Sequence, residues 1–183
     1  HILAIDQGTT STRALIFDEE ARVVASAQKE LAQSFPQPGW VEHDPIEIAE
    51  AAISVAKQAV GRAQLAPEDI AAIGITNQRE TPIVWERSTG RPVANAIVWQ
   101  DRRTAEICRD LAKSDHAHDI RQITGLVVDP YFSATKLMWL LTQRFPLQGR
   151  VGYGATGPIS TDSLPWHDVN RAYVRKATRV PRV

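Results

Sequence analysis

The first third of the chain alternates short apolar runs with polar turns, and this pattern predicts strands. Residues 2–6 form an apolar run that ends in an acid, a Gly-Thr-Thr-Ser-Thr turn follows, and residues 14–17 are apolar again. This is typical of two strands joined by a tight turn. After a second polar turn, residues 22–31 resume with Val23 and Val24. We therefore expect a three-stranded antiparallel meander over residues 2–31, although the Ala, Gln, Lys and Glu of its third strand are poor strand formers.

A helix is predicted over residues 45–64. Asp44 supplies an N-cap carboxylate, Pro45 suits the first helical position, and Glu47 is placed to reach back to the N–H of the cap residue. Apolar residues then recur at spacings of three and four, which predicts a single apolar face. This predicted face consists of Ile46, Ala49, Ile53, Ala56 and Val60.

The next apolar segment, residues 70–76, is continuous and of strand length. Such a run indicates a strand covered on both faces, and we expect it to lie beside the first strand. The meander, the helix and this strand together predict a mixed α/β fold with a helix packed on a sheet.

Composition narrows the class of protein. The 183 residues are 43% hydrophobic and 23% charged, with 21 Lys and Arg against 21 Asp and Glu. That balance disfavours nucleic-acid binding by bulk charge, and the apolar runs fall well short of the roughly 20 residues that a membrane span needs. The single cysteine, Cys108, leaves no internal disulfide, so we expect a cytoplasmic protein in which Cys108 is a small buried residue. Met138 is expected in the core.

The turn at residues 6–13 is the first candidate for chemistry. Gly8 permits a close backbone approach, and the hydroxyls and turn amides that follow it are suitable donors to phosphate oxygens. Arg13 adds a planar cation, and Asp6 is a candidate Mg²⁺ ligand, directly or through water. The segment lacks Gly-Lys-Ser/Thr and leads into a strand, so it is not a Walker loop. A plain hairpin with Ser/Thr turn chemistry and an exposed Arg is the alternative.

Five segments in order resemble the glycerol kinases of the FGGY carbohydrate kinase family. They are residues 6–13 (DQGTTSTR), 38–45 (PGWVEHDP), 74–81 (GITNQRET), 95–100 (NAIVWQ) and 129–133 (DPYFS). The resemblance covers residues 2 to about 141 and is to the start of the first of the family's two actin-like, ribonuclease-H-like domains. It implies an α/β fold with a mixed sheet and flanking helices, here incomplete.

The resemblance also implies roles for individual residues. Thr9, Thr10, Ser11 and Arg13 match the turn that binds ATP phosphates, and Asp6 matches a carboxylate associated with Mg²⁺. The residues that match the family's glycerol site are Arg79, Glu80, Trp99 and Tyr131.

Arg79 and Glu80 supply a donor fork beside an acceptor, which suits hydroxyls that both donate and accept. Adjacent residues of a regular strand point to opposite faces, so both reach one ligand only if the chain is irregular there. The alternatives are a solvated loop pair for Arg79 and Glu80, a core position for Trp99 and a surface ring for Tyr131.

The implied activity is ATP-dependent phosphorylation of glycerol, with glycerol and ATP as ligands. No residue of this sequence matches the family's general base, so no catalytic residue is assigned and the chain alone is expected to be inactive. A non-catalytic kinase remnant and a kinase of a related polyol or sugar are the alternatives. The oligomeric state, a homo-oligomer included, is left open.

Residues 142–183 read as a different kind of sequence from residues 2–141. Within this segment, residues 151–183 hold five Lys and Arg against two Asp and Glu, are rich in Gly and Pro, and show no sustained period. We therefore expect a division at about residue 141, followed by a poorly packed tail. A truncated or frame-shifted ending and a divergent ending that packs adequately are both open.

Overall fold

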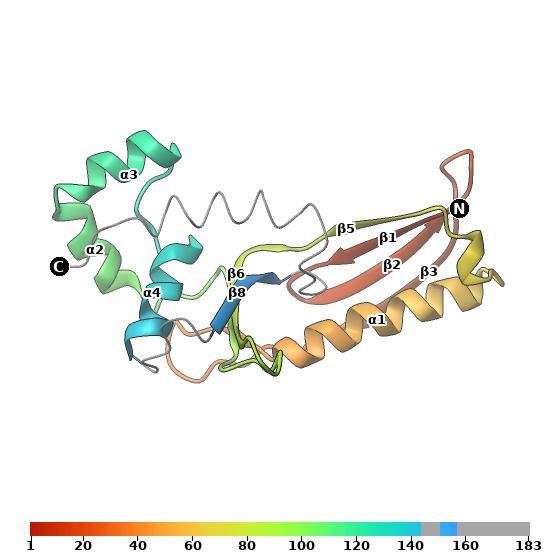
Figure 1. Ribbon diagram of the computed structural model, residues 1–183, viewed down its shortest axis with the longest axis horizontal. Coiled ribbons are helices and arrows are strands. Elements are labelled where there is room, and N and C mark those ends of the chain that lie inside the picture. The colour runs from red at the N-terminus through yellow and green to blue at the C-terminus, as the bar shows by residue number, and fades with distance from the viewer. Residues whose placement is uncertain (144–150, 157–183) are drawn as a thin grey trace.

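The computed structural model describes residues 1–143 and 151–156. Figure 1 shows an elongated molecule. A sheet and helix α1 (Pro45–Arg62) lie at one end, and helices α2 (Ala105–Lys113), α3 (His116–Thr124) and α4 (Ser133–Gln143) lie at the other. Strands β6 (Gln78–Glu86) and β8 (Val151–Thr156) lie between them. The mixed α/β class predicted from the sequence is confirmed.

The main sheet has the strand order β3-β2-β1-β5. Its members are β1 (Ile2–Gln7), β2 (Ser11–Phe17), β3 (Val23–Glu30) and β5 (Ala72–Thr76). The first three pair antiparallel, which confirms the predicted meander. Strand β5 runs parallel to β1, with Ile2 opposite Ala72 and Asp6 opposite Thr76, so it lies beside the first strand as expected.

Helix α1 (Pro45–Arg62) begins where the sequence predicts, because Asp44 caps it. The backbone N–H of Ile46 donates to Asp44 Oδ1 at 2.8 Å, which satisfies one of the helix's unpaired donors. Glu47 does not complete the expected reciprocal cap, since its Oε1 accepts from the N–H of Ala32 at 3.4 Å.

The predicted buried face of α1 is only partly right, because Ala56 and Val60 pack half-buried against the core. Ile46 and Ile53 are 48% and 45% exposed, and the buried side chains are instead Pro45, Ile48, Ala51, Ala52, Val55 and Ala59. Small alanines let the helix axis approach the sheet closely, so the stripe with more alanine packs and the larger isoleucines are left outside. The core formed there includes Leu3, Ile5, Ala14, Ile16 and Ala27 of the sheet.

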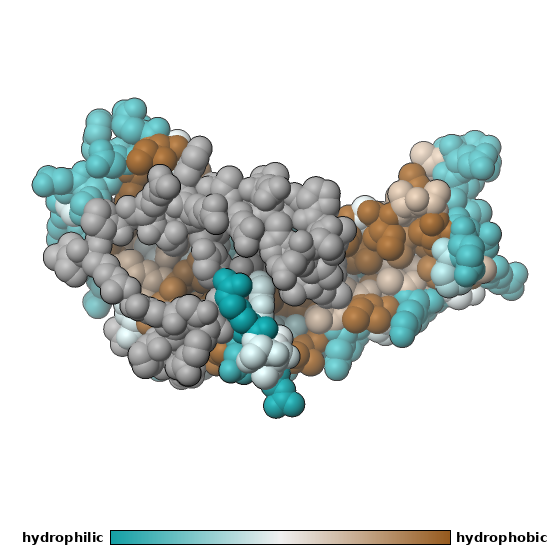
Figure 2. All heavy atoms as spheres, in the orientation of Figure 1, coloured by the Kyte–Doolittle hydropathy of each residue, from teal (hydrophilic) through white to brown (hydrophobic). Residues whose placement is uncertain are grey.

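The expectation that the strand at residues 70–76 is covered on both faces is also wrong. Within the described part of the chain β5 is an edge strand, and Ile73 is 60% exposed. Helix α1 packs along β1, β2 and β3 and does not extend over β5 to the same degree. Within β5, Ile75 packs against the core and is only partly buried. Figure 2 shows apolar side chains at the surface of this end of the molecule.

A 3₁₀ turn (Pro67–Asp69) lies beside the N-terminus, whose ammonium donates to the carbonyl of Asp69 at 3.1 Å. The remaining elements lie in the middle and at the far end of the molecule, away from the main sheet. They are β4 (Glu42–His43), β6 (Gln78–Glu86), β7 (Ala96–Ile97), α2 (Ala105–Lys113), α3 (His116–Thr124), α4 (Ser133–Gln143) and β8 (Val151–Thr156). β4 pairs with β7 and β6 with β8, both antiparallel. A second core joins Val84, Ile97, Leu137 and Leu140. Met138, expected in the core, is 50% exposed.

Strand β8 falls within the segment that the sequence marks as a divergent tail. It pairs with β6 from Glu86 opposite Val151 to Gln78 opposite Thr156. The other residues after Gln143 lie outside the described part of the chain, so the division at residue 141 stays a prediction. Among the described residues, no helix has the length and apolar character needed to cross a membrane.

A buried arginine ties this far end together. The Arg103 side chain is 2% exposed, and its Nη2 lies 2.8 Å from both Glu42 Oε1 and Asp101 Oδ2. Its guanidinium carbon lies 3.8 Å from the ring centroid of Trp40 and 4.9 Å from that of Trp139. Planar guanidinium groups suit both the carboxylate pairs and the stacking on rings. One side chain thus joins β4, the segment after β7 and helix α4.

We expect Arg103→Met to lower the free energy of unfolding by about 3–5 kcal/mol, because it leaves the fully buried carboxylate of Asp101 without its cation. The neighbouring Arg102→Met is the matched control. Arg102 forms an exposed pair with Asp129, so its loss should cost under about 1 kcal/mol. Urea denaturation followed by tryptophan fluorescence measures both. Equal losses in the two variants would contradict the role given to Arg103.

Candidate functional site

The turn between β1 and β2 is tight enough to require glycine. The N–H of Gly8 donates to the carbonyl of Ser11 at 3.0 Å, and a Cβ at Gly8 would lie 2.9 Å from that same oxygen. The backbone N–H groups of Thr9 and Thr10 have no partner among the described residues. Successive free N–H groups on a turn form an anion-binding concavity, so the local geometry fits a phosphate.

A pocket of about 290 Å³ lies at this turn. It brings together five of the residues singled out in the sequence: Asp6, Thr9, Arg79, Trp99 and Tyr131. The remaining lining residues are Gln7, Gly8, Asn77 and Gln78. Four other predicted site residues, Thr10, Ser11, Arg13 and Glu80, do not line it. Two segments about 70 residues apart in the sequence therefore meet at one opening.

Arg13 lies beside the pocket. It is directly opposite Asp6 in the β1–β2 register, so the two side chains share the face of the sheet that α1 does not cover. Its Nε and Nη2 donate to Gln28 Oε1 at 3.1 and 3.0 Å, and Gln28 Nε2 donates to Ser11 Oγ at 3.2 Å. Thr10 is exposed. Arg13 and Ser11 are thus held together by one glutamine of β3.

Trp99 joins the two halves of the pocket. Its indole Nε1 donates to Thr9 Oγ1 at 2.9 Å, and its ring meets that of Tyr131 edge-on with centroids 5.8 Å apart. Its backbone N–H donates to Thr81 Oγ1 at 3.2 Å. A half-buried indole with its N–H engaged and one ring edge against a tyrosine is a wall of the pocket.

A buried polar network behind the pocket was missed by the sequence reasoning. Gln78 Nε2 donates to the carbonyl of Gly8 at 3.0 Å, and Gln78 Oε1 accepts from Thr81 Oγ1 at 3.2 Å. Gln7 Oε1 accepts from the N–H of Gln78 at 3.4 Å. Gln7 follows Ile5 by two residues and so lies on the same, core-facing side of β1. A polar residue at such a position was the signal from which a buried hydrogen bond could have been expected. These bonds fix the turn between β1 and β2 to β6.

His43 borders the same network. Its Nδ1 lies 3.4 Å from Gln78 Nε2, and its buried Nε2 has no partner in the described structure. Burial lowers the pKa of His43 below its usual value, with the Glu47 carboxylate acting in the opposite direction. The ring is therefore neutral at pH 7, and it adds no positive charge behind the turn.

The chain is irregular at Arg79 and Glu80, as the sequence argument required. Glu80 has φ of +60°, a left-handed conformation that non-glycine residues rarely adopt. The β6–β8 register shifts between Gln78 and Pro82. Glu80 Oε2 accepts from both the N–H and the Oγ of Ser133 at 2.8 Å. Arg79 is exposed and its guanidinium has no partner in the described part of the chain.

Comparison with known proteins agrees with this geometry. Residues 1–152 match the model of the FGGY family of carbohydrate kinases, N-terminal domain. The chain belongs to this family. Glycerol kinase 2 of Thermotoga maritima is 60% identical over 141 residues, which cover 77% of this chain and 28% of that protein. The glycerol kinase of Sinorhizobium fredii is 50% identical over 184 positions, covering 100% of this chain and 37% of that protein.

Among solved structures, the glycerol kinase of Plasmodium falciparum with ADP superposes with a TM-score of 0.79 at 37% identity. The match covers 85% of this chain and 32% of that one. This FGGY-family chain thus spans about a third of the length of the relatives that it matches. The actin-like mixed sheet with flanking helices is confirmed.

A buried lysine lies next to the pocket of this FGGY-family chain. Lys136 on α4 is 0% exposed, and its Nζ donates to the carbonyls of Tyr131 at 2.7 Å and Glu80 at 2.9 Å. Burial lowers the pKa of Lys136 to about 8, with the carboxylates of Glu80, Asp101 and Asp129 opposing the shift. The ammonium is therefore still protonated at pH 7.

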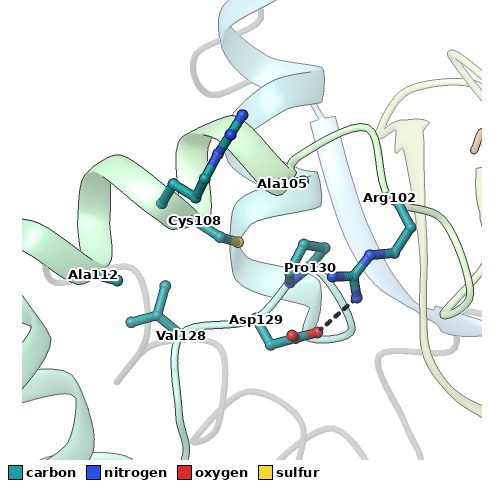
Figure 3. A pocket seen from close by; sticks show the side chains of 8 residues that line it. Arg102, Ala105, Cys108, Ala112, Val128, Asp129 and Pro130 are labelled. Atoms are coloured by element: carbon teal, nitrogen blue, oxygen red, sulfur yellow. Dashed lines mark hydrogen bonds and ion pairs between the residues drawn. The ribbon is translucent and has the colours of Figure 1, made fainter.

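A second cavity of about 440 Å³ lies between α2 and the segment before α4. Figure 3 shows Arg102 and Asp129 facing each other beside it, joined by an ion pair of 3.3 Å. The Cys108 thiol next to it donates to Thr135 Oγ1 at 3.6 Å, and burial raises the pKa of that thiol. Cys108 is thus a buried small residue with no thiolate character at neutral pH, as expected.

The buried ammonium predicts an unusual pH dependence of stability. Lys136 titrates near pH 8 in the folded chain and near 10.5 when unfolded, so between these values the unfolded chain binds more protons. Its contribution to the free energy of unfolding should therefore rise with pH across this window, by about 3 kcal/mol.

Urea denaturation of the unchanged chain and of Lys136→Met between pH 7.5 and 10.5 measures this effect. Groups common to both chains cancel in the difference. The free energy of unfolding of the unchanged chain should rise relative to that of Lys136→Met as the pH increases. A difference that stays constant or falls would contradict the buried ammonium.

Proposed function

We propose that this chain carries the glycerol-binding and phosphate-binding part of an ATP-dependent glycerol kinase. The supporting observation is the pocket in which Thr9 of the phosphate turn and Trp99 of the polyol wall are joined by a 2.9 Å hydrogen bond. The relatives named as glycerol kinases, at 50–60% identity, support the same substrate. A kinase of another polyol or sugar would use the same kinds of group.

ATP fits the phosphate turn. The free N–H groups of Thr9 and Thr10, with the hydroxyls of Thr9 and Ser11, would hold phosphate oxygens, and the missing Cβ of Gly8 lets the turn close. Arg13, on the same face as Asp6, would add positive charge if it turned from Gln28. The bound nucleotide supplies the phosphoryl group to be transferred.

Mg²⁺ fits Asp6 as a single protein carboxylate. Asp6 is exposed at the end of β1 and is the carboxylate among the residues that line the pocket. Mg²⁺ in phosphoryl-transfer sites is usually held by one or two carboxylates together with phosphates and water. The described residues include no group of three potential metal ligands, so Asp6 would hold the ion jointly with the nucleotide.

The polyol would lie between Arg79, Trp99 and Tyr131. The guanidinium of Arg79 donates, the Tyr131 hydroxyl both donates and accepts, and the indole of Trp99 contacts carbon atoms. Glu80 contributes through Oε1, which has no partner in the described structure, while Oε2 is bound by Ser133. Glu80 does not line the pocket in this conformation, so a small side-chain rotation would bring Oε1 to the ligand.

Activity requires more than these residues supply. Phosphoryl transfer depends on placing nucleotide, metal and acceptor in line, with a base for the attacking hydroxyl. No residue of the chain matches the family's base. We therefore expect the chain alone to bind its ligands weakly and to turn over at background.

A chimaera tests the proposal. Residues 1–143 of this chain replace the homologous segment of the Thermotoga maritima glycerol kinase, and glycerol 3-phosphate is measured with ATP, Mg²⁺ and glycerol. We expect turnover in the ordinary enzymatic range, about 1–1000 per second, from the chimaera, and background from the 183-residue chain. Activity with another polyol in place of glycerol would favour the related kinase. A folded but inactive chimaera would favour the non-catalytic remnant.

Within the active chimaera, Arg79→Ala should lower kcat/KM for glycerol by about 10- to 100-fold, because it removes a charged donor to a substrate hydroxyl. Arg91→Ala is the matched control, since Arg91 is an exposed arginine of the loop after β6. The KM for ATP should stay within about twofold in both variants. Equal effects of the two substitutions would remove Arg79 from the site.

A further inference from the structure

Lys136 makes two contacts that the packing of α4 does not require. Its neighbours Leu137 and Leu140 fill the second core, whereas Lys136 reaches past that core with its whole side chain buried. Its ammonium ends on two backbone carbonyls, those of Glu80 and Tyr131, which lie 51 residues apart in the sequence. Both residues belong to the polyol part of the proposed site.

Glu80 is held by α4 at both of its ends. Its carboxylate accepts from the N–H and hydroxyl of Ser133 at the start of the helix, and its carbonyl accepts from Lys136 one turn later. A left-handed glutamate is disfavoured and persists only when its surroundings hold it. The two contacts from α4 supply that restraint, and they set where Arg79 and the free Oε1 of Glu80 point.

Tyr131 is fixed in a similar way. Its N–H donates to Asp129 Oδ1 at 2.8 Å, and its carbonyl accepts from Lys136 at 2.7 Å. The backbone at Tyr131 is therefore held on its N–H side by the Asp129 carboxylate and on its carbonyl side by the Lys136 ammonium. The Tyr131 ring is left to face Trp99 and Phe132.

Charged groups surround the ammonium without a direct carboxylate bond to it. Glu80 of β6, Asp101 of the segment after β7 and Asp129 of the segment before α4 all favour its protonated form, and so does Cys108 of α2 if its thiol ionises, while burial opposes that form. Because charged donors form the stronger hydrogen bonds to carbonyl oxygens, loss of the proton should loosen both contacts.

We propose that Lys136 is a positioning residue for the polyol: its ammonium fixes the backbone at Glu80 and Tyr131, so that polyol affinity, and not nucleotide affinity, depends on it. The identity of the ligand in this inference rests on the proposed function. The link between Lys136 and the two carbonyls does not depend on that function and is tested separately.

The first measurement uses the 183-residue chain and needs no ligand. Lysine labelled with ¹³C at Cε reports the titration of Lys136, and ¹⁵N resonances report the backbone amides that follow the two carbonyls, those of Thr81 and Phe132. We expect both amides to shift with the same midpoint as Lys136, near pH 8. In Lys136→Met these shifts should vanish. Amides that stay unmoved while Lys136 titrates would overturn the positioning role.

The second measurement uses the chimaera defined above. Lys136→Met should raise the KM for glycerol by at least about tenfold, the effect of losing one charged hydrogen bond, with the KM for ATP changed less than about twofold. In the unchanged chimaera the KM for glycerol should rise above pH 8, and in the variant it should be flat.

Thr135→Val is the matched control for damage to α4. Thr135 is a buried neighbour whose hydroxyl hydrogen-bonds to Thr104 Oγ1 at 3.0 Å and to the Cys108 thiol at 3.6 Å. It should alter stability and leave the KM for glycerol and its pH profile unchanged. A parallel rise of both KM values in Lys136→Met, or the same profile in Thr135→Val, would make Lys136 merely structural.

The two measurements separate the possible failures. An unchanged chimaera without kinase activity overturns the proposed function and with it the polyol as ligand. Should Lys136→Met fail to fold, the pH profile of the unchanged chimaera and the amide titration of the unchanged chain still decide the question.

Discussion

The buried guanidinium of Arg103 is the charge around which the far end of the molecule is assembled. It can be buried only because Glu42 and Asp101 neutralise it and two indole rings cover it. Those partners come from β4 and the segment just before it, from the segment after β7 and from α4. Asp101 follows Trp99 by two residues and also accepts from the N–H of Val41 at 2.7 Å, so the position of the indole in the pocket depends on this cluster.

The same requirement extends to α4. Trp139, which packs against Arg103, lies on the helix that also carries Ser133 and Lys136. The helix is thus anchored at one site by Arg103, and it restrains the left-handed Glu80 at another. Buried charges rarely add to stability compared with apolar residues of the same size. Of the two buried cations, Lys136 contacts the backbone of β6 and of the turn at Tyr131, and Arg103 acts on them only through the position of α4.

The sequence predicted what local patterns determine. The meander and the Asp44 cap followed from short-range spacing and chemistry, and a strand beside β1 was expected from its apolar run. The irregularity at Glu80 was only a condition, set by the roles that the family resemblance implies for Arg79 and Glu80. The buried face of α1 did not, because two apolar stripes were available and the closeness of helix to sheet decided between them. Met138 was expected in the core and is 50% exposed, whereas Lys136, on which no expectation was stated, is fully buried. The carbonyls of residues 80 and 131 that accept from the Lys136 ammonium are distant in the sequence from α4 or precede it, so hydropathy along the helix gives no sign of them.

The pocket's residues could be named from motifs, but their connection could not. Gln7, Gln78 and Thr81 are ordinary strand residues in the sequence, yet their hydrogen bonds join the turn between β1 and β2 to the irregular stretch of β6. The hydrogen bond from Trp99 to Thr9 is a second, more exposed connection to the same turn. A shift of the turn on phosphate binding would therefore be felt at Trp99 and at the backbone of Gln78 together. Two parts of a pocket that are joined both at the surface and in the core are expected to move together, and under the proposed function this would help to hold two ligands in line for transfer.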